Sequence, residues 1–335
     1  MKKRFLPFLS LTFSAMLLAA CGQQGAASTA GKETAGGAGD FPDKPINLIV
    51  SFAAGGGTDL GARVLAAEVE EDLGVPVNVI NKPGGGGWVG WADLVKAKPD
   101  GYTIGYVNTP NLITGYLNPG LNRSETIESF APICNHITDA GVIAVKADDK
   151  RFKTIEDVIE YAKKHETTTT STGLGSDDHI AALKINEAQG TKFKAVHTGG
   201  LAENMANILG GHVDVFFANV GEVANEVDKG EIKILAVLSE ERSTYLPDVP
   251  TLKEAGYGDI YSWSARGLAA PKGTDPEVLK ILESAFEKGI NNEKHKAKMD
   301  EMGLQIDYKN SADYKEMLKE EEKNVLEVED LLGWK

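Results

Sequence analysis

The stretch Ile46-Asn-Leu-Ile-Val-Ser-Phe-Ala-Ala-Gly-Gly-Gly-Thr-Asp59 decides how the fold of this chain is interpreted. Its first seven residues form a short apolar, β-branched run, which predicts a buried strand. Three glycines end that run, and residues 60–73 then space their apolar side chains as a helix does, after the N-cap types Thr58 and Asp59. A strand, a glycine turn and a helix in this order place free backbone N–H groups at a helix start, which favours binding of an anionic group.

Two phosphate-binding motifs do not fit the glycine turns of this region. A P-loop requires a lysine directly after its glycines, and none follows the first turn. In the second turn Gly85, Gly87 and Gly90 have the spacing of a dinucleotide-binding loop. The next predicted strand, 102–108, nevertheless ends in Asn108 and not in the acidic residue that would hold a ribose. We therefore expect no nucleotide and no other cofactor.

The chain continues with further strand and helix patterns. Residues 75–80 and 102–108 predict two more strands, and residues 88–96 predict a helix between them. Strands that alternate with helices in this way favour a parallel α/β sheet. In such sheets the loops after the strands bind ligands, so Asn108 and Thr109 are candidate site residues.

Composition narrows the class of protein. The 335 residues carry 35 Lys and Arg against 49 Asp and Glu, a formal net charge of −14. Because so acidic a chain offers no basic stripe to neutralise phosphates, we expect no nucleic-acid partner. Cys134 and His136 are isolated metal-ligand types, and two ligands without partners make a poor zinc site. We therefore expect no metal and interpret Cys134 as a small buried residue.

The N-terminus has the features of an export signal. Residues 1–20 combine a basic start with an apolar segment that is too short for a confident membrane span. The sequence Leu18-Ala-Ala-Cys21 has the form of a bacterial lipobox, so we expect cleavage before Cys21 and a lipid anchor on that cysteine at the outer face of the cytoplasmic membrane. A non-lipidated signal that is cleaved nearby is the alternative. Residues 21–40 are rich in small and polar types and predict a flexible tether.

A second glycine turn, Gly173-Leu-Gly-Ser-Asp-Asp-His179, precedes a helical pattern at 178–189. Ser176 is placed either to cap that helix or to donate a hydrogen bond to an anion, and we favour capping. Ser176 and His179 also suggest an exported serine hydrolase. The stretch lacks the G-x-S-x-G order of a nucleophile elbow, however, and neither an acidic partner nor oxyanion donors can be assigned. We expect no enzyme and no catalytic residue, and His179 then hydrogen-bonds either the site or the adjoining loop.

An ordered set of short segments covers nearly all of the chain from Phe41 onward. In chain order they are Phe41-Pro-x-Lys-Pro-Ile46, Phe52-Ala-Ala-Gly-Gly-x-Thr-Asp59 with Arg63, Val79-Ile-Asn-Lys-Pro-Gly84, Pro99-Asp-Gly-Tyr-Thr103, Gly173-x-Gly-Ser-x-x-His179, Leu209-Gly-Gly-His-Val-Asp214, Leu246-Pro-Asp-Val-Pro-Thr-Leu-x-Glu-Ala-Gly256 and Ala270-Pro-Lys-Gly273. No single segment is decisive, but the set resembles the substrate-binding receptors of tripartite tricarboxylate transporters, also called the Bug family.

The resemblance implies a type II periplasmic-binding-protein fold, in which two α/β domains hold the ligand in the cleft between them. Domain one would comprise residues 41–138 plus 262–335, and domain two residues 139–261. The implied function is capture of a small organic carboxylate, meaning a di- or tricarboxylate, an aromatic acid or an acidic amino acid, and its delivery to the membrane subunits of a transporter. A sensory receptor ectodomain that binds the same ligand is an alternative that the sequence does not separate from transport.

The resemblance also implies where the ligand binds, through backbone N–H groups and ordered waters from the first glycine loop and from loops of domain two. Together with the candidates above, the expected ligand-binding residues are Phe52, Ala54, Gly55, Gly56, Thr58, Asp59, Asn108, Thr109, Ser176, His179, Thr198, Gly199, Gly200 and Arg266.

The cleft walls leave several side-chain roles open. Thr198 stands where many family members carry an aromatic residue, so the ligands of those members cannot be assigned to this chain. His197 either faces the site or packs beside it, and Trp263 either lines the cleft or belongs to the core. Arg266 either pairs with a distal ligand carboxylate or forms an ion pair at a domain surface. Asp59 is expected to cap the first helix and to orient the glycine loop.

Overall fold

The computed structural model describes Gly39 and residues 41–334. The expected signal peptide, the lipidation site Cys21 and nearly all of the tether lie outside the described residues. Ala38–Lys335 forms one compact unit. Each helix in the described part of the chain is too short or too polar to cross a lipid bilayer.

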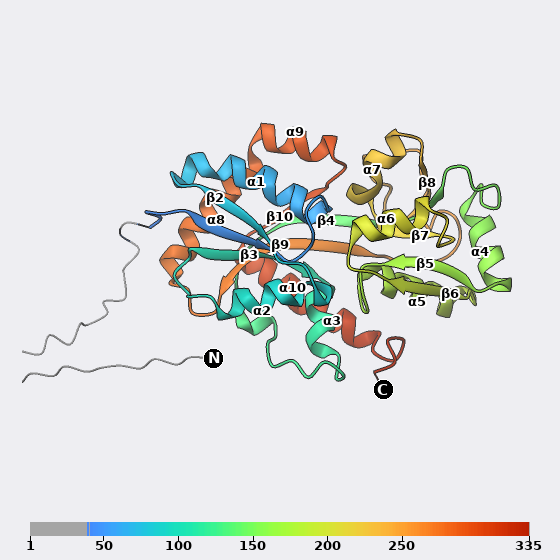
Figure 1. Cartoon of the computed structure of the whole chain (residues 1–335), viewed down its shortest axis with the longest axis horizontal. Helices are drawn as coiled ribbons and strands as arrows, with labels where there is room; N and C mark the ends of the chain where they lie inside the picture. Colours follow the sequence, from blue (N-terminus) through green and yellow to red (C-terminus); the bar gives the residue numbers. More distant parts are fainter. Residues whose placement is uncertain (1–38, 40, 335) are drawn as a thin grey trace, which may run out of the picture. The chain divides into compact units, whose positions relative to one another are not determined.

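The first elements form the parallel part of a sheet, as the sequence predicted. The strand β1 (Ile46–Val50) pairs in parallel with both of its neighbours. Around it the chain forms α1 (Gly57–Leu73), β2 (Val77–Asn81), the 3-10 turn η2 (Gly85–Gly87), α2 (Trp88–Lys96), β3 (Thr103–Thr109) and α3 (Asn111–Leu117). The helices α1 and α2 lie on opposite sides of these strands (Figure 1). Because α1 follows β1 in the chain, the β1–α1 loop lies at the carboxyl edge of the sheet.

Antiparallel strands extend the sheet. After the 3-10 turn η3 (Ile127–Ser129), the long strand β4 (Phe130–Lys146) pairs with β9 (Trp263–Pro271) and β10 (Ile306–Lys309), in the order β10-β4-β9-β3-β1-β2. The far end of β4 pairs with β7 (Phe216–Asn219) and β8 (Ile232–Val237). The sequence predicted only residues 141–145 of β4, because buried polar side chains such as Asn135, His136 and Asp139 interrupt its apolar pattern.

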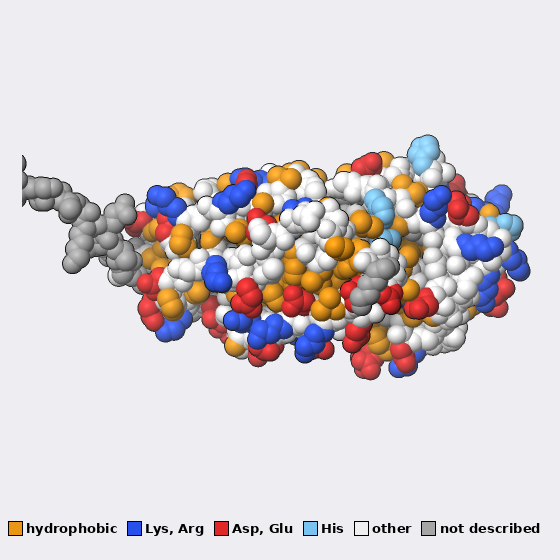
Figure 2. Space-filling model, turned by 90° about the horizontal axis from the view of Figure 1, so that it is seen from below, with side chains coloured by type: hydrophobic (Ala, Val, Ile, Leu, Met, Phe, Trp, Pro, Cys, Tyr) orange, Lys and Arg blue, Asp and Glu red, His pale blue; other side chains and the backbone are white. Residues whose placement is uncertain are grey.

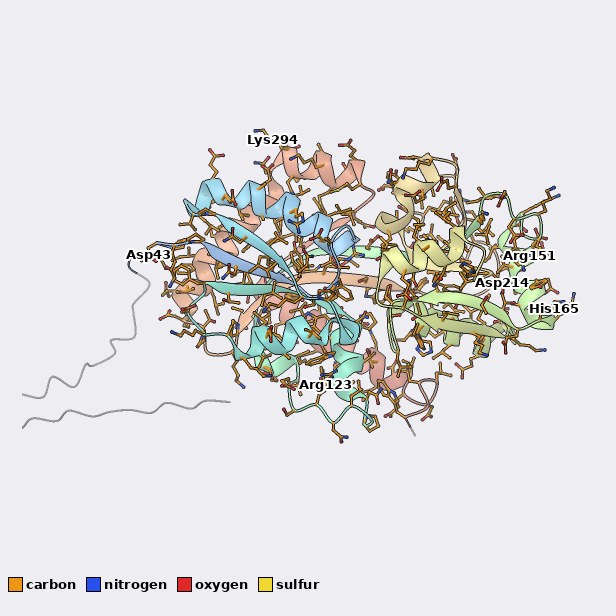
Figure 3. The ribbon with its side chains drawn as sticks, viewed as in Figure 1. Asp43, Arg123, Arg151, His165, Asp214 and Lys294 are labelled. Atoms are coloured by element: carbon orange, nitrogen blue, oxygen red, sulfur yellow. The ribbon has the colours of Figure 1, made fainter. Side chains whose placement is uncertain are left out.

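A smaller sheet lies beyond β4. Two parallel strands form it, β5 (Thr167–Ser171) and β6 (Phe193–His197). Helices α4 (Ile155–Lys164), α5 (Asp177–Gln189), α6 (Leu201–Leu209) and α7 (Val220–Asp228) complete this part of the chain. Threonines of β5 are buried, and their β-branched side chains suit a strand despite their polarity. At the outer end of this part of the chain, Arg151 Nη1 lies 2.7 Å from Asp214 Oδ1, and Figure 3 shows the two side chains side by side.

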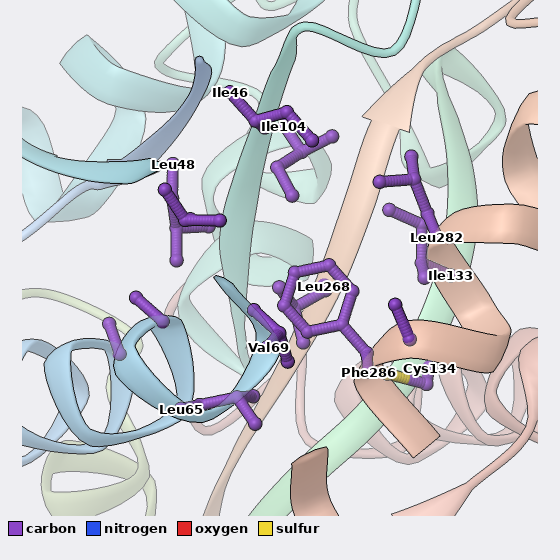
Figure 4. Close-up of a cluster of buried hydrophobic side chains, with 14 of the residues drawn as sticks. Ile46, Leu48, Leu65, Val69, Ile104, Ile133, Cys134, Leu268, Leu282 and Phe286 are labelled. Atoms are coloured by element: carbon purple, nitrogen blue, oxygen red, sulfur yellow. The ribbon is translucent and has the colours of Figure 1, made fainter. Parts of the chain in front are cut away.

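Three helices close the chain, α8 (Pro276–Asn291), α9 (Glu293–Glu301) and α10 (Ser311–Glu327). In one apolar cluster Val69 of α1 and Phe286 of α8 pack on Leu268 of β9 (Figure 4). This cluster draws only on residues 41–138 and 262–335, whereas a second cluster draws only on residues 139–261. A third cluster, however, joins Ile180 to Trp88 and Tyr314, so the domain boundaries remain a prediction.

Candidate ligand-binding cavity

The first wall of the site is the loop between β1 and α1. The helix begins at Gly57, with Gly56 as its N-cap and no side-chain cap, so the expected capping by Thr58 or Asp59 is wrong. Asp59 lies in the first helical turn and its Oδ2 accepts a hydrogen bond from the Gly55 N–H at 2.8 Å. The expected ordering of the glycine loop by Asp59 is therefore correct. Since no side chain caps α1, its first N–H groups remain free to bind an anion.

Asp59 is held in its ionised form inside the protein. Burial opposes ionisation, but hydrogen bonds from Arg63, Gly55 and Asn81 outweigh it and lower the pKa of Asp59. Arg63 Nη2 lies 2.9 Å from Asp59 Oδ1, and Asn81 Nδ2 donates to the same oxygen at 2.8 Å. The carboxylate is thus saturated by protein donors, and its role is to shape the loop.

The opposite wall carries acidic side chains. Asp177 begins α5, and Glu222 and Glu226 lie on α7. Asn219 connects the first two, since its Nδ2 donates to Asp177 Oδ2 at 2.8 Å and its N–H donates to Glu222 Oε2 at 3.3 Å. Burial raises the pKa of Glu222 to about 7; Arg266 opposes the rise, and the neighbouring carboxylates add to it. Burial likewise raises the pKa of Asp177.

Arg266 lies between the two walls and is 1% exposed. Its Nη2 is 3.0 Å from Asp139 Oδ2 and 4.0 Å from Glu222 Oε1. Its Nε and Nη1 atoms have no hydrogen-bond partner. A Cβ added to Gly57 would lie 2.6 Å from Nη1, so the guanidinium lies directly against the glycine loop. The structure therefore contains an ion pair of Arg266, which is buried and not at a domain surface as expected, and it leaves Nε and Nη1 without a protein partner.

Asn108 faces the same space from β3. It lies opposite Arg266 in the register between β3 and β9. Its Nδ2 donates to Thr58 Oγ1 at 2.7 Å, whereas its Oδ1 has no partner although the residue is only 3% exposed. The cavity wall therefore contains an unpaired acceptor as well as the unpaired donors of Arg266.

These groups enclose a cavity of about 320 Å³, which is the size of a small-molecule site. Eight of the expected residues line it: Phe52, Ala54, Gly55, Gly56, Thr58, Asn108, Gly200 and Arg266. Six do not: Asp59, Thr109, Ser176, His179, Thr198 and Gly199. The contacts of all fourteen with a ligand remain predictions.

The expected residues from the second glycine turn shape the loops behind the cavity. Ser176 is the N-cap of α5 and accepts from the N–H of His179, so capping is confirmed. His179 Nδ1 accepts from the Gly175 N–H at 3.1 Å, which orders the adjoining loop. Its ring packs edge-on against His197, with 4.8 Å between centroids. Thr198 Oγ1 donates to Asn204 Oδ1 at 2.7 Å.

Within residue 39 and residues 41–334, no three His, Cys, Asp or Glu side chains are grouped to hold a metal. Trp263 lines a different pocket, together with residues of α5 and α10. On the face shown in Figure 2, basic side chains are scattered among acidic ones.

Sequence reasoning missed the acidic wall altogether. Asp177 and Asp178 follow a glycine turn at a helix start, where acidic residues stabilise the helix dipole, so they carried no sign of a ligand. Glu222 forms a capping box with Asn219, which is again a local structural pattern. Only the tertiary fold, in which Asn219 binds both Asp177 and Glu222, shows that these two acids line one cavity.

Comparisons with known proteins agree with this arrangement. The sequence model TctC, described as "Tripartite tricarboxylate transporter family receptor", matches residues 61–331. A Cupriavidus necator protein, "UPF0065 protein in gbd 5'region", is 34% identical over 295 residues, which is 88% of this chain and 89% of that protein.

Two solved structures are similar in sequence and fold. A TctC solute-binding protein from Polaromonas has 33% identity and a TM-score of 0.66, with 88% of this chain and 99% of that chain covered. The periplasmic binding protein BugD has 29% identity and a TM-score of 0.81, with the same coverage of 88% and 99%. The expected α/β periplasmic-binding-protein fold is thereby confirmed.

Proposed function

The chain belongs to the tripartite tricarboxylate transporter receptor family, and from this premise we propose that its cavity captures a small organic carboxylate for delivery to a membrane transporter. The family is one of extracytoplasmic solute receptors and not a class of enzymes. The expected resemblance is therefore confirmed, whereas the ligand and the membrane subunits belong to the proposal.

The observation that carries the proposal is the donor set at one end of the cavity. The uncapped start of α1 offers backbone N–H groups, and the guanidinium of Arg266, with its unpaired Nη1, lies beside them. Donors held in place by the fold bind an anion without reorganisation, and the nearby guanidinium adds a fixed positive charge that favours a carboxylate. Binding and release of a ligand need no nucleophile or general base.

A thermal-shift and calorimetry panel of mono-, di- and tricarboxylates, aromatic acids and amino acids tests the proposal on the mature protein. A ligand that binds only the folded state stabilises it by RT ln(1 + [L]/Kd), so the melting temperature rises with the logarithm of the ligand concentration above Kd. We expect at least one carboxylate to bind, and its amide or ester analogue to bind much more weakly. If none of the carboxylates stabilises the protein, this function is wrong.

Anchoring is the second part of the proposal and rests on the lipobox that ends at Cys21. We expect the mature protein to partition with membranes and to carry a lipid mass on its N-terminal cysteine. The variant Cys21→Ser should be found in the soluble fraction. A wild-type protein that is soluble and cleaved elsewhere would support the non-lipidated alternative instead.

A further inference from the structure

The buried charges beside the cavity do not balance around Glu222. Of the elements packed against this side chain, β9 contributes a cation, whereas β4 and α5 contribute carboxylates. The groups that face it from these elements are Arg266, Asp139, Asp177 and Asp178. On its own helix Glu226 also lines the cavity and is paired with Lys229 at 2.8 Å. Carboxylates therefore outnumber cations before an anionic ligand enters, and uncompensated buried charge is costly.

Glu222 is the member of this group with an oxygen that the protein leaves unpaired. Asp139 lies 3.0 Å from Arg266 Nη2, and Asp177 Oδ2 accepts from Asn219 Nδ2 at 2.8 Å. Glu222 Oε2 accepts from the Asn219 N–H at 3.3 Å. Its Oε1, among the described residues, has only the guanidinium at 4.0 Å, beyond hydrogen-bond range. The side chain lines the cavity and is 12% exposed, so both a proton and a ligand can reach it.

A ligand carboxylate at the glycine loop would lie close to this oxygen. The guanidinium of Arg266 connects the two places, because Nη1 lies against Gly57 and Nη2 is the atom nearest Glu222. Two ionised carboxylates at such a buried position would repel one another. A protonated Glu222 would instead offer an O–H donor, and an O–H that donates to a carboxylate forms a short and strong hydrogen bond.

From these contacts we infer that Glu222 binds the ligand as a carboxylic acid: a proton from solvent bonds to Oε1 as the ligand enters, and the O–H donates to the ligand carboxylate. The proton returns to solvent when the ligand leaves. The inference rests on the proposed function and adds a ligand contact and a proton to it. Burial raises the pKa of Glu222 to about 7, and an anion beside the side chain raises it further, so ligand binding and protonation reinforce each other.

Calorimetry on the mature protein counts this proton. Binding is measured at pH 8 in HEPES and in Tris, whose ionisation enthalpies differ, so the difference in heat gives the protons taken up per ligand. The probe is whichever of succinate, tricarballylate, benzoate and glutamate binds most tightly. Because Glu222 is mostly ionised at pH 8 without a ligand, we expect an uptake of about one proton. Binding without uptake would overturn the inference.

The variant Glu222→Gln tests whether the proton belongs to this side chain. The amide keeps an oxygen that can accept from the Asn219 N–H, and its NH2 group donates as the acid O–H would. The variant should therefore bind the probe at pH 8 at least as tightly as the wild type, without taking up a proton. An uptake that persists in Glu222→Gln would assign the proton to another group, and the inference would be wrong.

The same pair of proteins predicts a pH profile. The wild type binds in its protonated form, which is abundant below about pH 7 and becomes scarce above it. From pH 6 to pH 8 its affinity should fall about tenfold relative to that of Glu222→Gln. The ionisation of the probe cancels because it is common to both proteins. A purely structural role of Glu222 would weaken the variant equally at both pH values and would contradict the inference.

The control variant is Glu231→Gln, which removes the same charge from an exposed position after α7. It should keep the affinity and the proton uptake of the wild type. The outcomes also separate the inference from the function on which it rests. Binding of the probe without proton uptake overturns the role of Glu222 and leaves carboxylate capture intact, whereas no binding of any carboxylate removes the proposed function itself.

Discussion

The two walls of the cavity are built from different kinds of group. The first wall presents backbone N–H groups, and the carboxylate behind it, Asp59, is saturated by Arg63, Asn81 and the Gly55 N–H. The second wall presents Asp177 and Glu222, whose pKa values are raised by burial. Backbone donors do not titrate and recognise any anion of suitable shape. Carboxylates titrate and repel further negative charge, so we expect selectivity among ligands to come from the second wall.

Breaking the link between the walls should have the largest effect. Arg266→Met leaves Asp139, which is fully buried, without its 3.0 Å partner. An unpaired buried carboxylate typically costs roughly 3–5 kcal/mol, so the free energy of unfolding should fall by about that amount. Urea denaturation with unchanged m-value measures it.

The double variant Arg266→Met with Asp139→Asn serves as the control for that experiment. Removing the orphaned charge should restore part of the lost stability, because the penalty belongs to the pair and not to the arginine alone. Additive losses in the double variant would show that the two residues do not act as a pair.

Filling the first wall should abolish binding with little loss of stability. Gly56 has φ −78°, which any residue adopts, and the nearest atom to an added Cβ is the Ala53 carbonyl oxygen at 3.7 Å. Gly56→Val should therefore fold normally while its side chain occupies the carboxylate position. Calorimetry should show a loss of affinity of roughly a hundredfold or more, since both the donors and the space are blocked.

Gly120→Val is the matched control, because Gly120 is exposed and does not line the cavity. Unchanged affinity in Gly120→Val and in Gly56→Val alike would mean that the ligand does not use the glycine loop.

The contrast between the walls also explains what could be predicted from the sequence. The glycine loop is local: strand, turn and helix lie within Ile46–Leu73, so neighbouring residues reveal it. The pairing of Asn108 with Arg266 depends on two strands far apart in the chain. Asp177 and Glu222 each lie in the first turn of a helix, where an acidic residue is locally favourable. A residue that is explained by its local structure gives no sign of a second role.

The long strand β4 was hidden for a related reason. Its buried polar residues, among them Asp139 and His136, find partners across the sheet and in α9, where His136 Nε2 lies 2.8 Å from His295 Nε2. A polar residue within a strand pattern predicts a loop when its buried hydrogen-bond partner is unknown. Both β4 and the acidic wall therefore depend on contacts between residues far apart in the chain, which local sequence patterns do not reveal.

The smallest predicted effect is a difference in the pH dependence of stability. The pKa of Glu222 is raised from 4.5 to about 7 by burial, so its contribution to stability is fully present below pH 4.5 and is lost as pH rises through 7. Glu222→Gln does not titrate. Relative to the wild type, its free energy of unfolding should therefore gain roughly 1–3 kcal/mol between pH 5 and pH 8. Urea denaturation of both proteins at the two pH values measures it, and histidines cancel because both proteins contain them.

The matched change on the first wall should have the opposite sign. The pKa of Asp59 is lowered by its hydrogen bonds, so its contribution is present above 3.8 and is lost as pH falls below that value. Asp59→Asn should thus cost stability at pH 7 and progressively less toward pH 3, whereas Glu222→Gln gains stability as pH rises. If the two variants showed the same pH slope, Asp59 and Glu222 would not differ in environment as the structure requires. Opposite slopes would mean that the fold favours the charged form of Asp59 and the neutral form of Glu222.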